Sequence, residues 1–182
     1  MTRADHVSGT DRVAEAASVS QAAIIVNVQG DEPMIDPAAI DAAILGLLDD
    51  DMGEVSMSTI MKRIERPADI QDPNVVKVVT DAQGTALYFS RSPIPYARDG
   101  SESPAYFKHI GLYVYRREFL LAYPDLPVGP LERAERLEQL RALENGHRIR
   151  VIETEYESLG VDTPDDWKQV AELFEKPMVN NR

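Results

Sequence analysis

The segment AAIIVNV, residues 22–28, restricts the possible folds more than any other part of the chain. Its apolar residues do not alternate with polar ones, which is typical of a strand that is buried on both faces of a sheet. Helices must cover both sides of such a sheet, so we expect an α/β fold in which this segment is a central, parallel strand. The strand runs directly into QGDEP, residues 29–33, where two carboxylates are adjacent.

The composition favours one domain that does not bind nucleic acid. The chain has 182 residues, 43% of them apolar, so we expect a single domain over residues 1–182 with its own core. Its 19 basic and 31 acidic side chains give a net charge of −12, which repels nucleic acids and anionic membranes. The chain has no cysteine, no signal-peptide pattern and no apolar run long enough for a membrane helix. We therefore expect no membrane insertion and a cytoplasmic, reducing location.

Helices and strands alternate along the rest of the chain. Asp36 as N-cap and Pro37 at the first helical position begin a helix whose apolar residues recur at helical spacing. Thr163 and Pro164 begin the last helix in the same way, and we expect Trp167 to pack this helix. Further helices are expected with Thr10 as N-cap, over residues 117–123, and from Pro130 to about Asn145.

The middle of the chain is expected to be antiparallel. Residues 74–81 and 85–95 have the composition of strands and flank a DAQG turn, which predicts a β-hairpin. Further strands are expected over residues 55–61, 109–116 and 148–154. The whole pattern predicts a mixed sheet flanked by helices.

The QGDEP segment lies where an open α/β sheet binds ligands, beyond the carboxyl end of a strand. Gly30 has no side chain and would let a ligand come close, and Asp31 could bind a hard dication that neutralises phosphate charge. The alternative is a turn in which Asp31 or Glu32 only caps the chain before Pro33. The spacing alone does not decide between the two.

Seven segments, collinear over nearly the whole chain, carry a family resemblance. They are TRADHxSGT (2–10), VNVQGDEP (26–33), DPNVVKVV (72–79), ALYFSRSPIP (86–95), HIGLYVYR (109–116), LEQLR (137–141) and GVDTPDD (160–166). Together they closely resemble the 3-deoxy-manno-octulosonate cytidylyltransferases, or CMP-Kdo synthetases, where Kdo is the sugar acid. The CMP-sialic acid synthetases are more distantly similar.

The resemblance implies a Rossmann-like nucleotidyltransferase fold with an antiparallel portion for the sugar site and the dimer interface. It also implies a homodimer that joins CTP and Kdo, with Mg²⁺, to give CMP-Kdo and pyrophosphate for lipopolysaccharide biosynthesis. The family's metal carboxylates fall on Asp31 and Asp162, and its nucleotide positions on Arg3, Gln29 and Gly30. By itself, Asp162 would be interpreted as a capping acid at a helix N-terminus.

The family's sugar-site positions fall on Arg91, His109 and Tyr113. Arg91 is the expected catalytic-site arginine, because a planar guanidinium can bind the Kdo carboxylate through two hydrogen bonds. His109 and Tyr113 are four residues apart on a predicted strand, so they should face the same side. The alternatives are an arginine at the surface and a histidine and tyrosine in the core.

The helix predicted after Pro130 contributes two more candidates. A rotation of about 100° per residue puts Glu132, Glu135 and Gln139 on one stripe, and such a stripe is most often a solvated face. The resemblance instead implies that Glu135 and Gln139 reach the hydroxyl groups of the sugar.

The sequence departs from the family at its front. Full-length members begin with a βαβα segment, whose first loop, of the form R-x-x-S-x-R-L-P-G-K, binds the CTP phosphates, and Met1 aligns with a later position. Neither a G-x-x-x-x-G-K nor a G-x-G-x-x-G string replaces that loop. We therefore expect the chain as given to have little cytidylyl transfer activity.

Two other functions fit parts of the sequence. A different nucleotide-sugar transferase could use a metal-binding acid at the same strand end, but Arg91, His109 and the GVDTP segment would then lose their common explanation. A non-catalytic Kdo-binding and dimerisation fragment would keep the sugar site without the chemistry. Product analysis with CTP and Kdo separates the first from a cytidylyltransferase, and sedimentation with and without Kdo tests the second.

Overall fold

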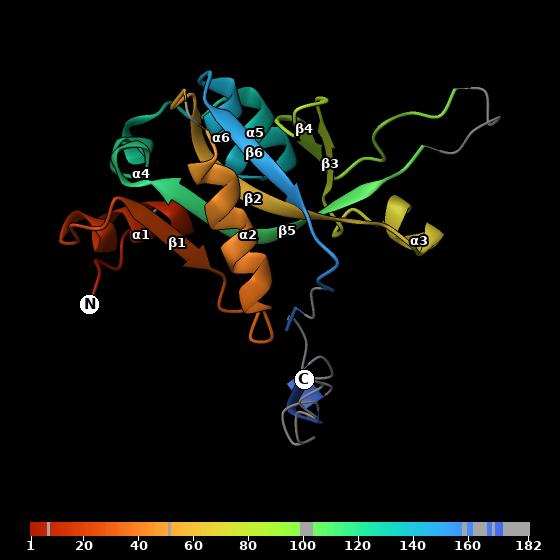
Figure 1. The fold of residues 1–182 in the computed structure, drawn as a ribbon, viewed down its shortest axis with the longest axis horizontal. Helices are drawn as coiled ribbons and strands as arrows, with labels where there is room; N and C mark the ends of the chain where they lie inside the picture. The colour runs from red at the N-terminus through yellow and green to blue at the C-terminus, as the bar shows by residue number, and fades with distance from the viewer. Residues whose placement is uncertain are drawn as a thin grey trace.

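The computed structural model describes residues 1–6, 8–50, 52–98, 104–157, 160–161, 167–168 and 170–172. Within them, six strands form one mixed sheet with helices on both faces (Figure 1). The strands are β1 (Ile24–Val28), β2 (Val55–Arg63), β3 (Lys77–Thr80), β4 (Ala86–Ser90), β5 (Phe107–Arg116) and β6 (Arg148–Glu153). They run in the order β4-β3-β5-β2-β6, with β1 also paired to β5. Of the pairs, β2–β6 is parallel and the others are antiparallel.

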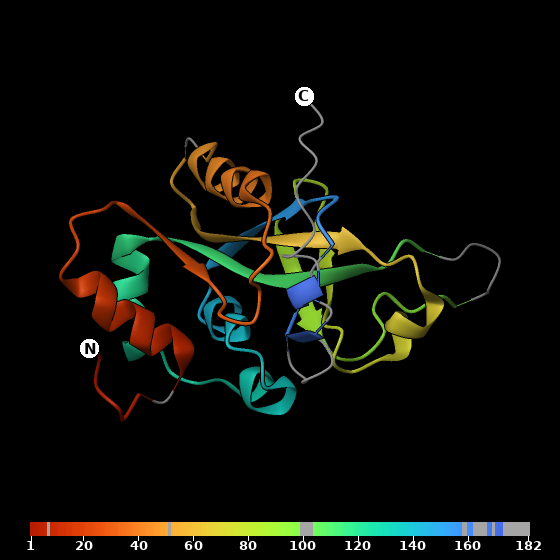
Figure 2. The ribbon, with the colours of Figure 1, turned by 90° about the horizontal axis from the view of Figure 1, so that it is seen from below.

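The helices form layers above and below the sheet. In Figure 2, α2 lies on one face, and α1 and α5 lie on the other. The helices are α1 (Gly9–Ser18), α2 (Pro37–Leu48), α3 (Pro67–Gln71), α4 (Arg117–Ala122), α5 (Pro130–Glu135) and α6 (Gln139–Glu144), with a 3₁₀ turn η1 (Tyr123–Asp125).

Strand β5 contributes to an apolar core on each face of the sheet. Leu112 and Val114 belong to the core with Ala43 of α2, whereas Tyr115 belongs to the core with Leu140 of α6. This division follows from the alternation of side chains along a strand. β5 is therefore the central strand. Its side chains that point to the same face of the sheet as α6 are candidates for a functional site.

Strand β1 differs from its prediction. It pairs antiparallel with β5, from Ile24 opposite Arg116 to Val28 opposite Leu112, and has no second strand neighbour in the described part of the chain. The prediction of a central, parallel strand was therefore wrong. Its apolar run has another cause: Ile25 packs against the α6-side core and Val26 against the α2-side core, so both faces are covered although one edge is unpaired.

Several predicted elements are confirmed. β3 and β4 form the expected hairpin, and the carboxylate of Asp81 accepts from the N–H groups of Gln83 (2.9 Å) and Thr85 (2.8 Å) in its turn. Asp36 caps α2 by accepting from the N–H of Ala38 at 2.8 Å. Leu48, at the end of that helix, is 52% exposed although it is apolar.

The helix predicted from Pro130 to about Asn145 is instead two helices, α5 and α6. Arg136 separates them with φ 55° and ψ 47°, and its N–H donates to the carbonyl of Glu132 at 2.8 Å. This left-handed conformation ends an α-helix and is usually supplied by glycine, so an arginine gives no sign of it in the sequence.

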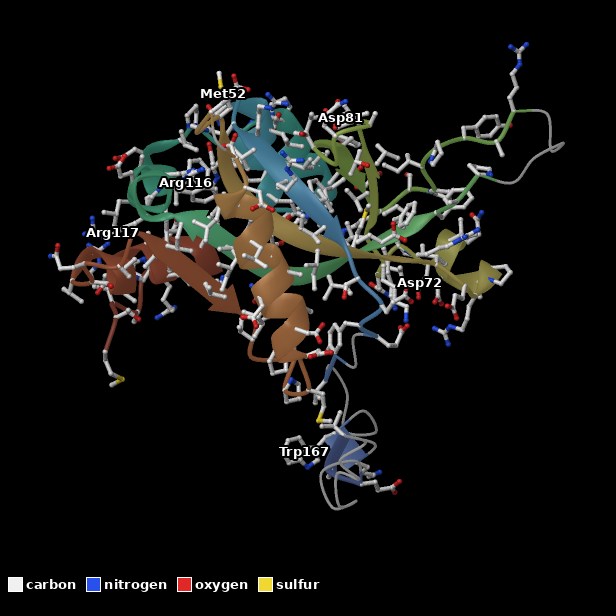
Figure 3. The ribbon with its side chains drawn as sticks, viewed as in Figure 1. Met52, Asp72, Asp81, Arg116, Arg117 and Trp167 are labelled. Atoms are coloured by element: carbon white, nitrogen blue, oxygen red, sulfur yellow. The ribbon has the colours of Figure 1, made fainter. Side chains whose placement is uncertain are left out.

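The two ends of the chain also differ from expectation. The N-cap of α1 is Ser8, not Thr10: Ser8 Oγ accepts from the N–H of Asp11, and the Asp11 carboxylate accepts from the N–H of Ser8, both at 3.1 Å. Trp167 is 62% exposed and lies away from the sheet (Figure 3), so it does not pack its helix as expected. The predicted helix start at Thr163 lies outside the described residues. Where the structure describes helices, none is long and apolar enough to cross a membrane.

Candidate active site

Asp31 and Glu32, adjacent in the turn after β1, have different surroundings. Glu32 is buried and accepts a hydrogen bond from the Tyr156 hydroxyl at 3.2 Å. Asp31 is exposed, and its backbone carbonyl accepts from the N–H of Val161 at 2.9 Å. One carboxylate thus stabilises the turn, while the other remains accessible. Asp162, the second predicted metal ligand, lies outside the described residues.

Residues from four distant parts of the chain line one cavity of about 270 Å³, which we call the site cavity. The residues used below are Gln29 and Asp31 after β1, Tyr113 of β5, and Arg136, Glu138 and Gln139 around the break between α5 and α6. The structure therefore brings together four of the residues that the sequence predicted: Gln29, Asp31, Tyr113 and Gln139.

Gly111 allows the turn after β1 to approach β5. A Cβ atom at this position would lie 3.3 Å from Cγ of Gln29, closer than ordinary van der Waals contact. A side chain at position 111 would therefore require Gln29 to shift by a few tenths of an ångström. At Gly30, by contrast, an added Cβ would meet no atom within 4 Å, so the described chain leaves open space beside it.

Tyr113 and Gln139 form a polar pair inside the site cavity. The Tyr113 hydroxyl donates to Oε1 of Gln139 at 3.2 Å. Burial, together with the charge on nearby Glu138, raises the pKa of Tyr113 well above its usual value, so the hydroxyl stays protonated. Gln139 is 4% exposed, and its Nε2 is buried without an acceptor among the described residues. A buried donor left unpaired costs about 1–3 kcal/mol, which a polar ligand would recover.

His109 lies behind Tyr113 on the same face of β5. The two ring centroids are 5.4 Å apart, which confirms that these residues face the same side. The Phe89 ring also contacts the imidazole edge-on, with ring centroids 5.1 Å apart, and His109 Nε2 is 2.9 Å from Thr59 Oγ1. Burial lowers the pKa of His109 to about 4, so the ring is neutral near pH 7.

Arg91 and Glu135 contact each other beside the site cavity, not on its lining. Arg91 donates from Nε to the carbonyl of Glu135 (2.7 Å) and from Nη1 to the carbonyl of Pro73 (2.9 Å). The Glu135 carboxylate accepts from the N–H of Arg91 at 2.9 Å and from Ser90 Oγ at 2.6 Å. Glu135 therefore joins α5 to the end of β4, which a solvated helix face would not do.

Arg3 is not brought into the site cavity. Its backbone N–H donates to the Glu15 carboxylate on α1, and its side chain is paired with Asp5 and Glu15 at the surface. His6 also bonds to Glu15. The segment before α1 is therefore organised around Glu15.

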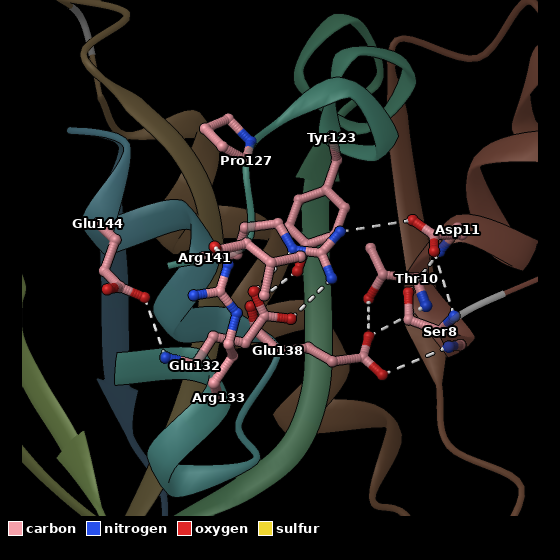
Figure 4. Close-up of polar contacts among 12 residues, drawn as sticks. Ser8, Thr10, Asp11, Tyr123, Pro127, Glu132, Arg133, Glu138, Arg141 and Glu144 are labelled. Carbon is pink, nitrogen blue, oxygen red and sulfur yellow. Dashed lines mark hydrogen bonds and ion pairs between the residues drawn. The ribbon is translucent and has the colours of Figure 1, made fainter. Parts of the chain in front are cut away.

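A buried ion pair next to the site cavity was missed by the sequence patterns. The Arg141 guanidinium donates from Nε and Nη2 to the two carboxylate oxygens of Glu132, at 2.8 and 2.6 Å, and lies 4.7 Å from the Tyr123 ring centroid (Figure 4). Asp11 Oδ1 is 3.7 Å from Nη1 of the same arginine. Glu132, expected on a solvated stripe, is 8% exposed.

Glu138 is a second residue that sequence reasoning missed. Its carboxylate accepts from the N–H and hydroxyl of Thr10, at 3.2 and 2.6 Å, and from the N–H of Gly9 at 3.3 Å (Figure 4). A carboxylate at a helix N-terminus is favoured by the unpaired N–H groups there. In the sequence, the position of Glu138 next to Gln139 in the LEQLR segment was the available indication that it lies near the site.

Comparison with known proteins places the chain in a family. Residues 1–149 match the family model described as Cytidylyltransferase. The chain is 70% identical over 174 residues to the 3-deoxy-manno-octulosonate cytidylyltransferase of Solibacter usitatus (strain Ellin6076), covering 96% of this chain and 68% of that protein. The chain belongs to the 3-deoxy-manno-octulosonate cytidylyltransferases. The enzyme of that name from Geobacter sulfurreducens (strain ATCC 51573 / DSM 12127 / PCA) is 56% identical over 182 residues, with 94% and 72% coverage.

Solved structures agree with membership of the cytidylyltransferase family. The structure of CMP:2-keto-3-deoxy-manno-octonic acid synthetase complexed with CTP is 43% identical, with a TM-score of 0.88, and covers 96% of this chain and 70% of that one. HddC from Yersinia pseudotuberculosis, at 12% identity and a TM-score of 0.60, shares the fold alone. The predicted α/β nucleotidyltransferase fold, with a mixed sheet between helices, is confirmed. The activity of the family is the formation of CMP-Kdo for lipopolysaccharide biosynthesis, as the sequence predicted.

Proposed function

We propose that CTP and Kdo meet in the site cavity, with Gln29 and Asp31 on the nucleotide side and Tyr113 and Gln139 on the sugar side. The observation that carries this proposal is the convergence of these four side chains, from segments far apart in the sequence, on one cavity. A structural relative that is complexed with CTP shares the fold at a TM-score of 0.88.

We infer that Asp31 and Asp162 hold Mg²⁺. Asp31 offers an exposed carboxylate, and its carbonyl bond to Val161 fixes the chain one residue before Asp162. No group of three or more histidine or acidic side chains that could hold a metal occurs among the residues described. Two carboxylates suffice, because Mg²⁺ commonly takes few protein ligands beside water and phosphate oxygens. Bound there, the ion would neutralise phosphate charge.

The chemistry requires positioning more than a covalent protein intermediate. The anomeric hydroxyl of Kdo attacks the α-phosphorus of CTP, a new P–O bond forms, and the bond to pyrophosphate breaks. Gln139 Nε2 can donate to a sugar oxygen, and the neutral Tyr113 hydroxyl orients that amide. The open space beside Gly30 would let the nucleotide approach the backbone.

The other predicted residues have supporting roles in this proposal. Arg91 would bind the sugar carboxylate through Nη2, because its Nε and Nη1 already donate to backbone carbonyls. Glu135 would position Arg91, and His109 would position Tyr113 from behind. Arg3, in the segment before α1, would bind the nucleotide.

The test is product formation measured by mass spectrometry with CTP, Mg²⁺ and either Kdo or a sialic acid. With the family's CTP phosphate-binding loop present, we expect CMP-Kdo from the wild-type sequence and a loss of product in Asp31→Asn and Gln139→Met. Product from the sialic acid alone would instead support the alternative substrate. Unchanged turnover in both variants would show that the site cavity takes no part in the reaction.

We also propose that the protein acts as a homodimer. Leu87 on β4 is 62% exposed and Tyr96, on the segment that follows β4, is 85% exposed, which supports a contact surface along this part of the chain. Sedimentation of the wild-type protein and of a Leu87→Ser, Tyr96→Ser variant tests this. A wild-type monomer at micromolar concentration would contradict the proposal.

A further inference from the structure

The break between α5 and α6 places an unusual residue at the site cavity. Arg136 has the only positive φ of a non-glycine residue in the described part of the chain, and its backbone is fixed there by the N–H bond to Glu132. The left-handed region is unfavourable for a residue with a Cβ atom, and glycine would fill the same position without strain. Backbone geometry therefore does not explain an arginine here, and its side chain is the remaining reason.

Arg136 is the one cationic side chain on the lining of the site cavity within the described residues. The lining also includes two acids, Asp31 and Glu138. Glu138 is occupied by the N-terminus of α1 and makes no ion pair with Arg136. The Arg136 side chain is exposed and forms no hydrogen bond or ion pair with any described residue. An unpaired guanidinium thus borders the site cavity, where the other charged lining residues are acidic.

Arg91, the arginine expected at the sugar, is placed differently. Two of its nitrogens already donate to backbone carbonyls, and it does not line the site cavity. A ligand inside the cavity would reach Arg136 without displacing any bond that the protein makes. In a chain with a net charge of −12, an anionic ligand needs such a cation.

We propose that Arg136 is a substrate-binding residue that donates to an oxyanion of a bound substrate in the site cavity. This inference rests on the proposed function, in which both substrates are anions: Kdo carries a carboxylate and CTP a triphosphate. The two share the chemistry that a guanidinium recognises, a pair of oxygens on one centre. The helix break fixes the backbone position from which the Arg136 side chain extends at the site cavity that Asp31 also lines.

Arg136→Gly is the informative variant, because glycine adopts the left-handed backbone freely and only the side chain is lost. Arg136→Lys keeps the charge but not the planar fork. Arg133→Gln is the matched control: it removes an exposed arginine from α5 that does not line the site cavity. Steady-state kinetics and calorimetric titration with CTP and with Kdo are run on each protein.

We expect Arg136→Gly to lower the affinity for one substrate by about 10- to 100-fold, the range for a charge-assisted hydrogen bond. Arg136→Lys should recover part of this loss. A rise in the KM and Kd for Kdo alone identifies the carboxylate as the partner, and a rise for CTP alone identifies a phosphate. If the KM and Kd of Arg136→Gly for both substrates lie within twofold of those of Arg133→Gln, the inference is overturned while the proposed function stands. A wild-type protein that binds neither CTP nor Kdo overturns both.

Discussion

The backbone N–H of Val161 donates to the carbonyl oxygen of Asp31 at 2.9 Å. This bond joins the turn after β1 to a segment far along the chain, immediately before Asp162. The backbone of Asp31, whose carboxylate is exposed, is therefore held beside Val161 by one hydrogen bond. The arrangement explains how acids so distant in sequence could share a cation.

The first prediction concerns these two acids. Asp31→Asn and Asp162→Asn should each lower turnover by a factor of about 10² to 10³, because an amide cannot neutralise the charge of Mg²⁺. The measurement is CMP-Kdo formation over a range of Mg²⁺ concentrations, with circular dichroism to check the fold. Asp41→Asn, an exposed aspartate on α2, is the matched control and should behave as wild type. Near-normal turnover in Asp31→Asn would contradict the proposed metal site.

The second prediction concerns the Tyr113–Gln139 pair. Tyr113→Phe removes the hydroxyl that donates to Gln139 Oε1, so the amide loses its orientation while the ring contact with His109 stays. We expect the KM for Kdo to rise by about 5- to 20-fold and the KM for CTP to stay within twofold, since one neutral hydrogen bond contributes about 1–2 kcal/mol. Tyr106→Phe, just before β5 and outside the lining of the site cavity, is the control. An equal rise for both substrates would place Tyr113 outside the sugar side.

Local patterns in the sequence predicted the elements whose boundaries depend on local chemistry. Asp36 and Pro37 marked the start of α2, and the DAQG turn marked the β3–β4 hairpin, because capping and turn residues act within a few positions. The alternation along β5 also gave the correct common face for His109 and Tyr113.

Features fixed by tertiary contacts could not be predicted in this way. The apolar run of β1 indicates that both faces are covered, but not whether the neighbouring strand is parallel or how many neighbours there are. No glycine in the sequence marks the break at Arg136, so one continuous helix was expected there. On that helix, Glu132 and Glu135 would lie together on a solvated face. In the structure one of these acids is paired with Arg141 and the other with β4, and only Gln139 reaches the site cavity.

The third prediction concerns the ion pair beside the site cavity. Arg141→Met should lower the free energy of unfolding by about 3–5 kcal/mol, because it leaves the Glu132 carboxylate buried and unpaired. The double variant Glu132→Gln, Arg141→Met should lose less than the sum of the single changes. Urea denaturation measures each value. Arg148→Met, which breaks an exposed pair with Glu54, should cost at most about 1 kcal/mol. A similar loss from Arg141→Met and Arg148→Met would show that burial does not strengthen the Arg141 pair.

The fourth prediction is a pH dependence of stability that comes from His109. Burial lowers its pKa in the folded protein from 6.5 to about 4, so between these values the unfolded chain binds a proton there and the folded protein does not. Stability should therefore fall as the pH is lowered from 6.5 to about 4, with no further contribution from this residue below pH 4. His109→Gln keeps a polar group near Thr59 but cannot titrate, and it should remove this part of the decline.

The measurement for His109 has two parts. Urea denaturation from pH 7 to pH 4 compares the slope for wild type with that for His109→Gln, and His147→Gln, which changes a histidine outside the site cavity, is the control. In parallel, the NMR signal of the His109 ring should not shift until the pH approaches 4, since the ring stays neutral between Phe89 and Tyr113. A ring that titrates near 6.5 in the folded protein would show that water reaches the imidazole, and the packing behind Tyr113 would then be looser than the structure has it.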